Sequence, residues 1–290
     1  MAAALHRRTK MAYSIERDES LSAAVVRIMN EQIVRARERL TDMQSPEEKR
    51  VHDARKRFKE TRALIRLVRE PLGDQFALEN AWFRDAGREL ASTRDEAAIL
   101  EALEKLDVSP RIKETAKHAI EESHPQQEHS RPLDTIVASL VEQLVFPSVR
   151  IASWPPIEDS FDSIAGGLGD AYRGGRRGLK SNSAEELHEW RKRVKEHWYH
   201  AQLLRAMWPP MMKAYAGVLE DLSHALGDHH DLHVLRDRVG ARQYKLLAAI
   251  DAKQRALTVE AMDIGRRVYA ERPRRWVARM REYWSAWRAA

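Results

Sequence analysis

The sequence of 290 residues contains no cysteine and only 12 glycines and 11 prolines. The absence of cysteine excludes disulfides and thiolate metal sites, and it is typical of proteins of a reducing compartment. No run of about 18 apolar residues occurs, and the basic N-terminus has no apolar segment, so we expect neither a membrane span nor a standard secretion signal. Sustained alternation of apolar and polar residues is also missing, which argues against a β-sheet. We therefore expect an all-α protein of the cytoplasm that has no membrane partner.

The residues that are abundant favour helices and carry charge of both signs. Hydrophobic residues make up 43% of the chain, enough to bury one large core or two modest ones. The net charge is +6 and the pI is about 9.5, but 32% of all residues are charged. Because acidic and basic residues are mixed, net charge alone says little about a partner. The arrangement of the basic residues is more informative.

Breaks in the helical pattern predict a basic, flexible extension over 1–17 and a single domain over 18–290. Within this domain, Trp154-Pro155-Pro156 separates half one, about 18–153, from half two, about 157–290. We expect Ser45 and Asp228 to be helix N-caps. The predicted helices cover about 20–40, 46–69, 75–92, 94–107, 110–124, 132–152, 158–179, 184–207, 211–226, 229–238, 241–271 and 273–288.

A charged nine-residue pattern occurs twice and is the most informative feature of the chain. His-x-x-Arg-Lys-Arg-x-Lys-Glu begins at His52 and again at His188. Leu90–Asp95 and Leu226–Asp231 are related by the same offset. When 51–69 is compared with 187–205 position by position, the identical residues include every basic residue of the pattern. The shared offset predicts an internal duplication that produces two pseudo-symmetric halves resembling four-helix bundles.

On a helical wheel, each copy separates an apolar face from a basic stripe. The apolar face of the first copy contains Val51, Ala54, Phe58, Thr61, Ile65 and Val68, and that of the second contains Leu187, Trp190, Val194, His197, Ala201 and Leu204. The basic stripes contain His52, Arg55, Lys56, Lys59, Arg62 and Arg66 in one copy, and His188, Arg191, Lys192 and Lys195 in the other. On the third face we expect ion pairs of Asp53 with Arg57 and of Glu189 with Arg193.

Like charges at helical spacing repel one another, so a repeated basic stripe favours a ligand over a merely solvated face. Arginine presents a fork of donors to phosphate oxygens, lysine presents a compact charge, and a polyanion nearby favours protonated histidine. The residues therefore indicate a polyanion, with a chain of phosphates as the natural ligand. The glycines between Gly166 and Gly178 indicate close helix packing or, alternatively, close approach of the backbone to that ligand.

The paired His-x-x-Arg-Lys-x-x-Lys helices, with Tyr172–Arg177, Trp198-Tyr199 and Leu226-Gly227, resemble the CHAD (conserved histidine α-helical domain) family over about 18–288. That resemblance implies an all-helical domain whose basic central groove or pore binds inorganic polyphosphate, and it implies association with polyphosphate granules. The resemblance also implies that phosphate contacts nine stripe residues: His52, Arg55, Lys56, Lys59, Arg62, His188, Arg191, Lys192 and Lys195. Further phosphate contacts are expected from Tyr199, Arg37, Arg173 and Arg176. The family usually has a basic residue at this position of each half; half one has Arg62 there, but half two has Trp198. We therefore expect half two to bind the polymer less evenly. The Glu-x-Glu-x-Lys motif of a triphosphate-tunnel enzyme is missing, so the chain resembles a stand-alone copy.

Three alternatives remain open at this point. His229 and His233 have the i,i+4 spacing of a metal site, although the pattern lacks the glutamate of zinc peptidases. Nucleic acid is a second polyanion, and Trp190 and Trp198 are candidates for base stacking. An enzyme is the third, but no nucleophile, general base or phosphate-binding loop is recognisable. We expect a binding protein that has no cofactor and no catalytic residue.

Overall fold

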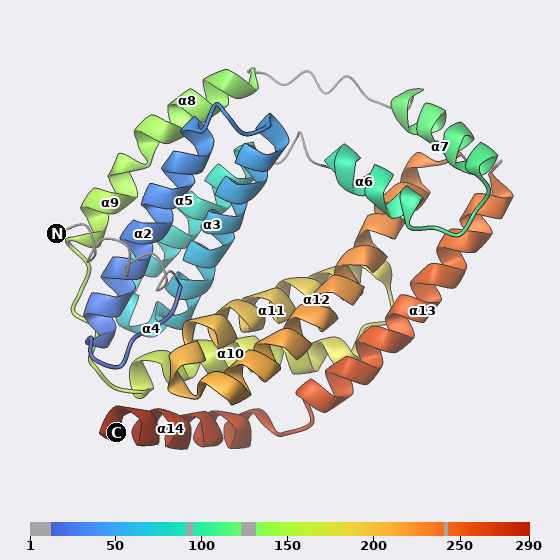
Figure 1. Ribbon diagram of the computed structural model, residues 1–290. Coiled ribbons are helices and arrows are strands. Elements are labelled where there is room, and N and C mark those ends of the chain that lie inside the picture. The colour runs from blue at the N-terminus through green and yellow to red at the C-terminus, as the bar shows by residue number, and fades with distance from the viewer. Residues whose placement is uncertain (1–12, 91–94, 123–131, 241–242) are drawn as a thin grey trace.

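The computed structural model describes residues 13–90, 95–122, 132–240 and 243–290, and the elements in these ranges are helical (Figure 1). Half one contains α2 (Leu21–Thr41), α3 (Glu47–Leu67), α4 (Arg69–Leu72), α5 (Asp74–Glu89), α6 (Asp95–Glu104), α7 (Pro110–Glu122), α8 (Leu133–Gln143) and α9 (Val145–Ile151). Half two contains α10 (Asp162–Arg177), α11 (Ala184–Leu203), α12 (Pro209–Arg238), α13 (Tyr244–Val268) and α14 (Pro273–Ala289). Among the described helices, none combines the length and apolarity that crossing a bilayer requires.

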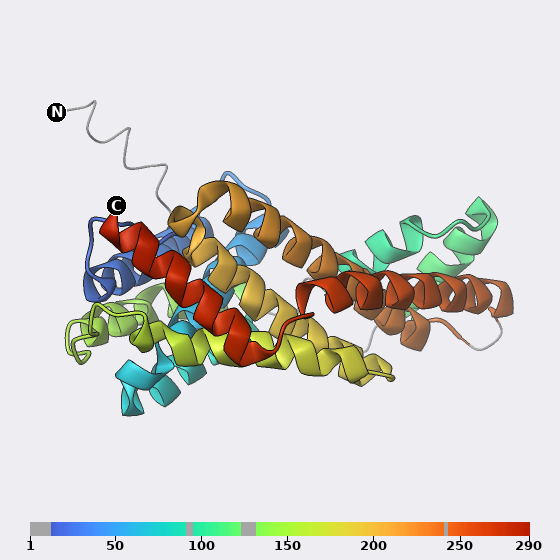
Figure 2. The ribbon, with the colours of Figure 1, turned by 90° about the horizontal axis from the view of Figure 1, so that it is seen from below.

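The halves do not separate cleanly in space. Helices α2, α3, α5, α8 and α9 form one group, and α10 to α14 form another. The pair α6 and α7 precedes the junction in sequence, yet α6 packs against α12 of half two. Figures 1 and 2 show this pair beside α12 and α13, away from the other helices of half one. Half one therefore contributes a helical hairpin to the side of half two.

The order of packing is the same in both halves. Helix α2 packs on α3 and α3 on α5, just as α10 packs on α11 and α11 on α12. When the two basic patterns are aligned, the long helix α12 corresponds to α5 and α6 together with the segment between them. Helix α14 contacts α10 as α8 and α9 contact α2. The basic helices α3 and α11 thus occupy equivalent places, and they also contact each other.

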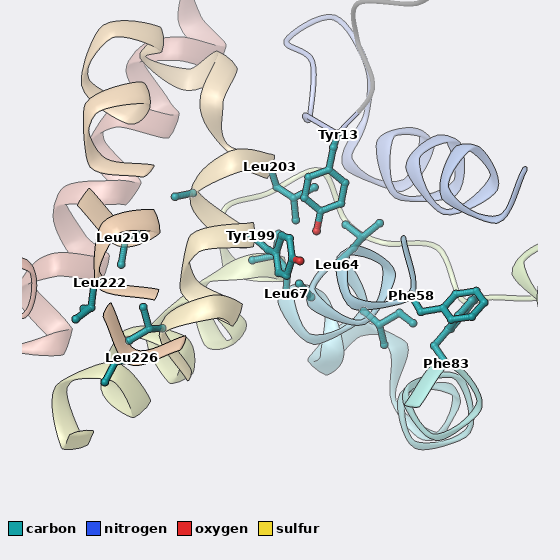
Figure 3. Packing of buried hydrophobic residues seen from close by; sticks show 14 of the residues in the cluster. Tyr13, Phe58, Leu64, Leu67, Phe83, Tyr199, Leu203, Leu219, Leu222 and Leu226 are labelled. Atoms are coloured by element: carbon teal, nitrogen blue, oxygen red, sulfur yellow. The ribbon is translucent and has the colours of Figure 1, made fainter. Parts of the chain in front are cut away.

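The two predicted apolar faces are buried, as the spacing indicated. Every one of the residues named for these faces is at most 5% exposed. Phe58 packs against Phe83 of α5, while Leu64, Leu67 and Leu203 lie near the crossing of α3 and α11 (Figure 3). Burying side chains of this size supplies about 1.5–3 kcal/mol each, so the apolar face dictates which side of each basic helix stays accessible.

The glycines of α10 serve helix packing. A Cβ atom on Gly167 would overlap the carbonyl oxygen of Leu67, so α10 approaches the end of α3 at backbone distance. A Cβ on Gly175 would meet the Tyr269 ring, and one on Gly178 would meet the Trp190 ring. Of the two interpretations of these glycines, close packing explains their positions.

Several predicted helix boundaries were wrong. The single helix expected over 132–152 is divided into α8 and α9. Residues 211–238 do not form two helices, because Gly227 and Asp228 lie inside α12 and Asp228 is not an N-cap. The N-cap of α3 is Pro46, and the Ser45 hydroxyl donates to Asp42 instead.

The predicted N-terminal extension is described only from residue 13 onward, and residues 1–12 lie outside the described ranges. Residues 13–15 are buried, in contrast to the expected flexible segment. The Ile15 amide donates to the carbonyl of Leu203 over 2.8 Å, which fastens this segment to the end of α11.

Candidate functional site

The first basic stripe follows one side of α3, next to its buried face. All six of its side chains are partly exposed, whereas the intervening Val51, Ala54 and Phe58 are buried. The helix therefore holds its cations at the surface because its apolar face is anchored in the core. The expected pair of Asp53 with Arg57 does not form: Asp53 lies 3.7 Å from Arg39, and Arg57 pairs with Glu60 over 2.5 Å.

At its C-terminal end this stripe turns toward α5. The Oδ1 atom of Asn80 accepts hydrogen bonds from Nε of Arg62 (3.2 Å) and from Nε of Arg66 (3.4 Å). Burial, followed by repulsion from Arg66 and Arg84, lowers the pKa of Arg62 to about 10, although Glu196 acts in the opposite direction. The helical wheel of α3 alone did not reveal this extension. The spacing of Asn80, Arg84 and Arg88, at i,i+4 intervals on α5, was the available signal.

The second stripe runs along α11, and its His188 and Arg191 reach α12. Arg191 packs over Gly227 of α12, where a Cβ atom would come within 3.3 Å of its Nε. Lys192 forms an ion pair with Glu189 over 2.5 Å, and the Nζ of Lys195 lies 6.0 Å from the centre of the Trp198 ring. The expected pair of Glu189 with Arg193 is replaced by this contact with Lys192. Gly227 thus keeps α12 close enough to support the arginine.

The histidine of the second stripe belongs to a cluster at the same helix interface. The rings of His188 and His230 are 3.9 Å apart between centroids. Burial and the charges of Lys192 and Arg191 lower the pKa of His188. Burial, His188 and Arg191 lower the pKa of His230 to about 4. Both rings are therefore neutral at pH 7, and a polyanion that binds beside them would favour their protonation.

The two stripes approach each other where α3 crosses α11. Arg66 Nη1 donates to Glu196 Oε2 over 2.7 Å, and His200 Nε2 lies 2.8 Å from the carbonyl oxygen of Ala63. Figure 1 shows the two helices close at their C-terminal ends and diverging toward their N-terminal ends. The basic residues near His52 and near His188 therefore lie on two arms that extend from a common crossing.

Tyr199 lies at this crossing but does not reach the surface. It is 3% exposed and packs edge-on against Tyr13 (Figure 3), whose hydroxyl donates to the carbonyl of Glu60 over 2.7 Å. Burial, with the nearby Glu60, raises the pKa of the Tyr199 hydroxyl. The expected phosphate contact of Tyr199 is therefore corrected to a packing role, because a buried ring cannot meet a polymer on the surface.

The three arginines expected from the preceding helices lie on α2 and α10, and their phosphate contacts stay predictions. Arg37 is exposed on α2. Arg173 forms an ion pair with Asp170 on its own helix. Arg176 donates to the backbone carbonyls of residues 269–271, where it closes the connection between α13 and α14. Nη1 of Arg176 therefore has a structural role, and a phosphate contact by the rest of this guanidinium stays a prediction.

The features that motivated the alternatives receive little support. His229 and His233 line a pocket of about 300 Å³ near the start of α11, but no group of three or more potential ligands in the described ranges has the geometry of a metal site. Trp190 is 1% exposed, with its ring against Gly178 and Gly265, so it cannot stack on a base. Trp198 is only partly buried and remains beside Lys195.

Comparison with known proteins agrees with this arrangement. The family model described as the CHAD domain matches residues 27–240, which include both basic helices. The crystal structure of the CHAD domain from the plant Ricinus communis is similar with a TM-score of 0.56 and 18% sequence identity, over 90% of this chain and 96% of that chain. A comparison with curated proteins gives no match. At such low identity, the structural similarity concerns the fold alone.

Proposed function

This chain belongs to the CHAD domain family, and from that membership we propose that it binds inorganic polyphosphate through the basic faces of α3 and α11. The CHAD domain is associated in general with polyphosphate binding. The observation that carries the proposal is the repeated set of His, Arg, Lys and Lys on two equivalent helices that meet at their C-terminal ends. Two arms of basic residues suit a long, flexible polyanion better than a compact one.

The proposed mechanism is multidentate electrostatic capture. Each contact of a lysine or arginine with one phosphate is weak, but contacts along a linear polymer add up because the phosphates are tethered to one another. Affinity should therefore rise with polymer length and fall steeply with salt, since each contact releases counterions. We propose binding without catalysis, because the stripes supply charge and donors for phosphates and no recognisable catalytic motif accompanies them. Association with polyphosphate granules would follow directly from binding the polymer.

The first test compares ligands. The protein is titrated with long-chain polyphosphate, single-stranded DNA and duplex DNA at matched phosphate concentration and about 150 mM salt. We expect clear preference for polyphosphate. Equal affinity for all three would mean a nonspecific basic surface, and nucleic acid would then become the leading partner.

The second test locates the site. Reversing both equivalent lysines, Lys59→Glu with Lys195→Glu, should abolish polyphosphate binding while far-UV circular dichroism stays unchanged. Lys245→Glu with Lys253→Glu on α13 is the matched control, because it changes the net charge equally at two exposed positions outside the stripes. Retained affinity in the first variant, or equal loss in the control, would remove the stripes from the site.

A further inference from the structure

Four arginines from two helices converge beside the crossing of α3 and α11. Arg62 and Arg66 come from α3, and both donate to the side-chain oxygen of Asn80 on α5. Arg84 and Arg88 follow Asn80 on α5, and repulsion from both contributes to the lowered pKa of Arg62. All four side chains are partly or fully exposed, so a ligand can reach them. We call these four residues the arginine cluster.

The cluster is only partly neutralised by the protein. Arg66 is paired with Glu196, and Arg84 donates to both carboxylate oxygens of Asp85 over 2.8 and 2.9 Å. Arg88 lies 3.6 Å from the same Asp85. Within the described part of the chain Arg62 has no ion pair, and its guanidinium is held by the neutral amide of Asn80. A half-buried cation without a carboxylate partner is costly, so an external anion would stabilise Arg62.

Half two lacks this cluster. The equivalent positions, at the offset that relates His52 to His188, are Trp198 for Arg62, Gln202 for Arg66, Ala216 for Asn80, Glu220 for Arg84 and His224 for Arg88. The equivalent helices α11 and α12 pack together without any residue of the cluster. Helix packing alone therefore does not require the cluster, and it is a feature of half one only.

We propose that the arginine cluster is an additional anion subsite for adjacent phosphates of a condensed phosphate chain, and that Asn80 is its positioning residue. The Asn80 side-chain oxygen holds Nε of both guanidinium groups without adding charge. Arg66 also pairs with Glu196, whereas the remaining donors of Arg62 face no carboxylate partner among the described residues and suit phosphate oxygens. A carboxylate at this position would pair with the same donors and compete with the ligand. Because Arg62 and Arg66 also belong to the α3 stripe, a polymer on that stripe runs directly into the cluster. This inference rests on the proposed function and assigns stronger binding to half one.

The experiment uses Asn80→Asp, which keeps the shape of the side chain and adds a negative charge. Titration with sodium tripolyphosphate should show about tenfold weaker binding than the wild type, because the new carboxylate would pair with Arg62 and add negative charge beside Arg66. The variant Arg84→Ala with Arg88→Ala should weaken binding about fivefold. Its affinity should also fall less steeply with salt, by an amount that corresponds to the loss of about one to two phosphate contacts. Asn182→Asp, an exposed position before α11, is the charge-matched control and should bind within about twofold of the wild type.

The outcomes separate this inference from the proposed function. If Asn80→Asp and the arginine variant bind like the wild type while Lys59→Glu with Lys195→Glu loses polyphosphate, the proposed function holds and the subsite is wrong. If Asn80→Asp and Asn182→Asp lose affinity equally, the effect is one of net charge and the subsite is also wrong. If the wild type itself shows no preference for condensed phosphate, the proposed function fails. An unchanged melting temperature of Asn80→Asp shows that lost binding does not come from unfolding.

Discussion

Helices α3 and α11 carry the same basic side chains, yet they pack against their neighbours in different ways. Four stripe positions are identical between them, from the histidine to the last lysine of the pattern. A core tolerates exchange of apolar residues when the neighbours adjust, whereas nothing in packing requires a basic stripe. The six positions of the predicted apolar faces differ in every case: Val51 and Leu187, Ala54 and Trp190, Phe58 and Val194, Thr61 and His197, Ile65 and Ala201, Val68 and Leu204. Two other buried pairs are identical, Glu60 with Glu196 and Leu67 with Leu203. The four shared stripe positions are therefore kept between the two helices while their apolar faces are built from different residues.

The adjustment of neighbours is visible at one pair of positions. In half one, Ala54 is small, and Phe58 one turn later packs against Phe83 and Trp82. In half two, Trp190 takes the place of the alanine, and its ring lies against two glycines, Gly178 and Gly265. Each half therefore fills its core with a different large side chain, and the glycines make room for the tryptophan.

Removing this tryptophan should destabilise the protein strongly. Trp190→Ala should lower the free energy of unfolding by about 3–5 kcal/mol, because the ring is fully buried and the glycines around it cannot fill the cavity. Urea denaturation followed by circular dichroism measures the change. Trp208→Ala, at a position 46% exposed, is the control and should cost much less.

A second substitution makes the test specific to the contact. Gly178→Ala alone should destabilise by about 1–3 kcal/mol, since its Cβ would overlap the Trp190 ring. In the Trp190→Ala background the overlap disappears, so the double variant should lose less than the sum of the two single variants. Strict additivity would contradict the packing of Trp190 against Gly178.

A prediction of intermediate size concerns the stability of the protein at acidic pH. The position of Thr61 in half one is occupied by His197 in half two, and burial lowers the pKa of His197 to about 3. The folded state thus binds fewer protons than the unfolded state, whose histidines titrate near pH 6.5. Stability should fall as the pH falls from about 6.5 toward 3, by about 2 kcal/mol between pH 6.5 and pH 5 from this residue.

The variant His197→Gln measures this contribution. It removes the titration but keeps a polar side chain near the hydroxyls of Tyr215 and Tyr269, which lie 3.3 Å from the two ring nitrogens. Plots of unfolding free energy against pH should be flatter for the variant, whatever its stability at pH 7. His118→Gln, at an exposed position of α7, should keep the slope of the wild type. An equal slope in all three proteins would be evidence against a buried, neutral His197.

The pH dependence of polyphosphate binding should be weaker still. Because burial and neighbouring cations lower the pKa of His188, the free protein is neutral there and the bound polyanion favours protonation. Affinity should rise as the pH falls, by about threefold between pH 7 and pH 6, in binding isotherms at constant salt. His188→Ala should blunt this rise more than His52→Ala, since His188 also contacts His230. An unchanged pH profile in both variants would exclude the two histidines from the site.

Much of the fold was predictable because helical periodicity is a local property. The apolar faces of α3 and α11 follow from the spacing of their residues, and the structure buries all of them. The helix break expected at Gly227 was wrong because tertiary packing overrode local propensity: α12 uses this glycine to approach Arg191. The phosphate contact expected of Tyr199 was wrong for a related reason. Its ring packs against Tyr13, which lies near the N-terminus and far from α11 in the sequence.

Local spacing was enough to establish that the chain is helical and that two segments present the same basic stripe. Both properties depend on residues within a few turns of one another, where spacing dictates which side chains share a face. How the two stripes meet, through Arg66 with Glu196, emerges only when the helices are packed together. The same is true of α5, which brings Asn80 and two further arginines to the end of one stripe. Those relations join residues from different helices, and their geometry follows from how the buried faces pack, which no local pattern encodes.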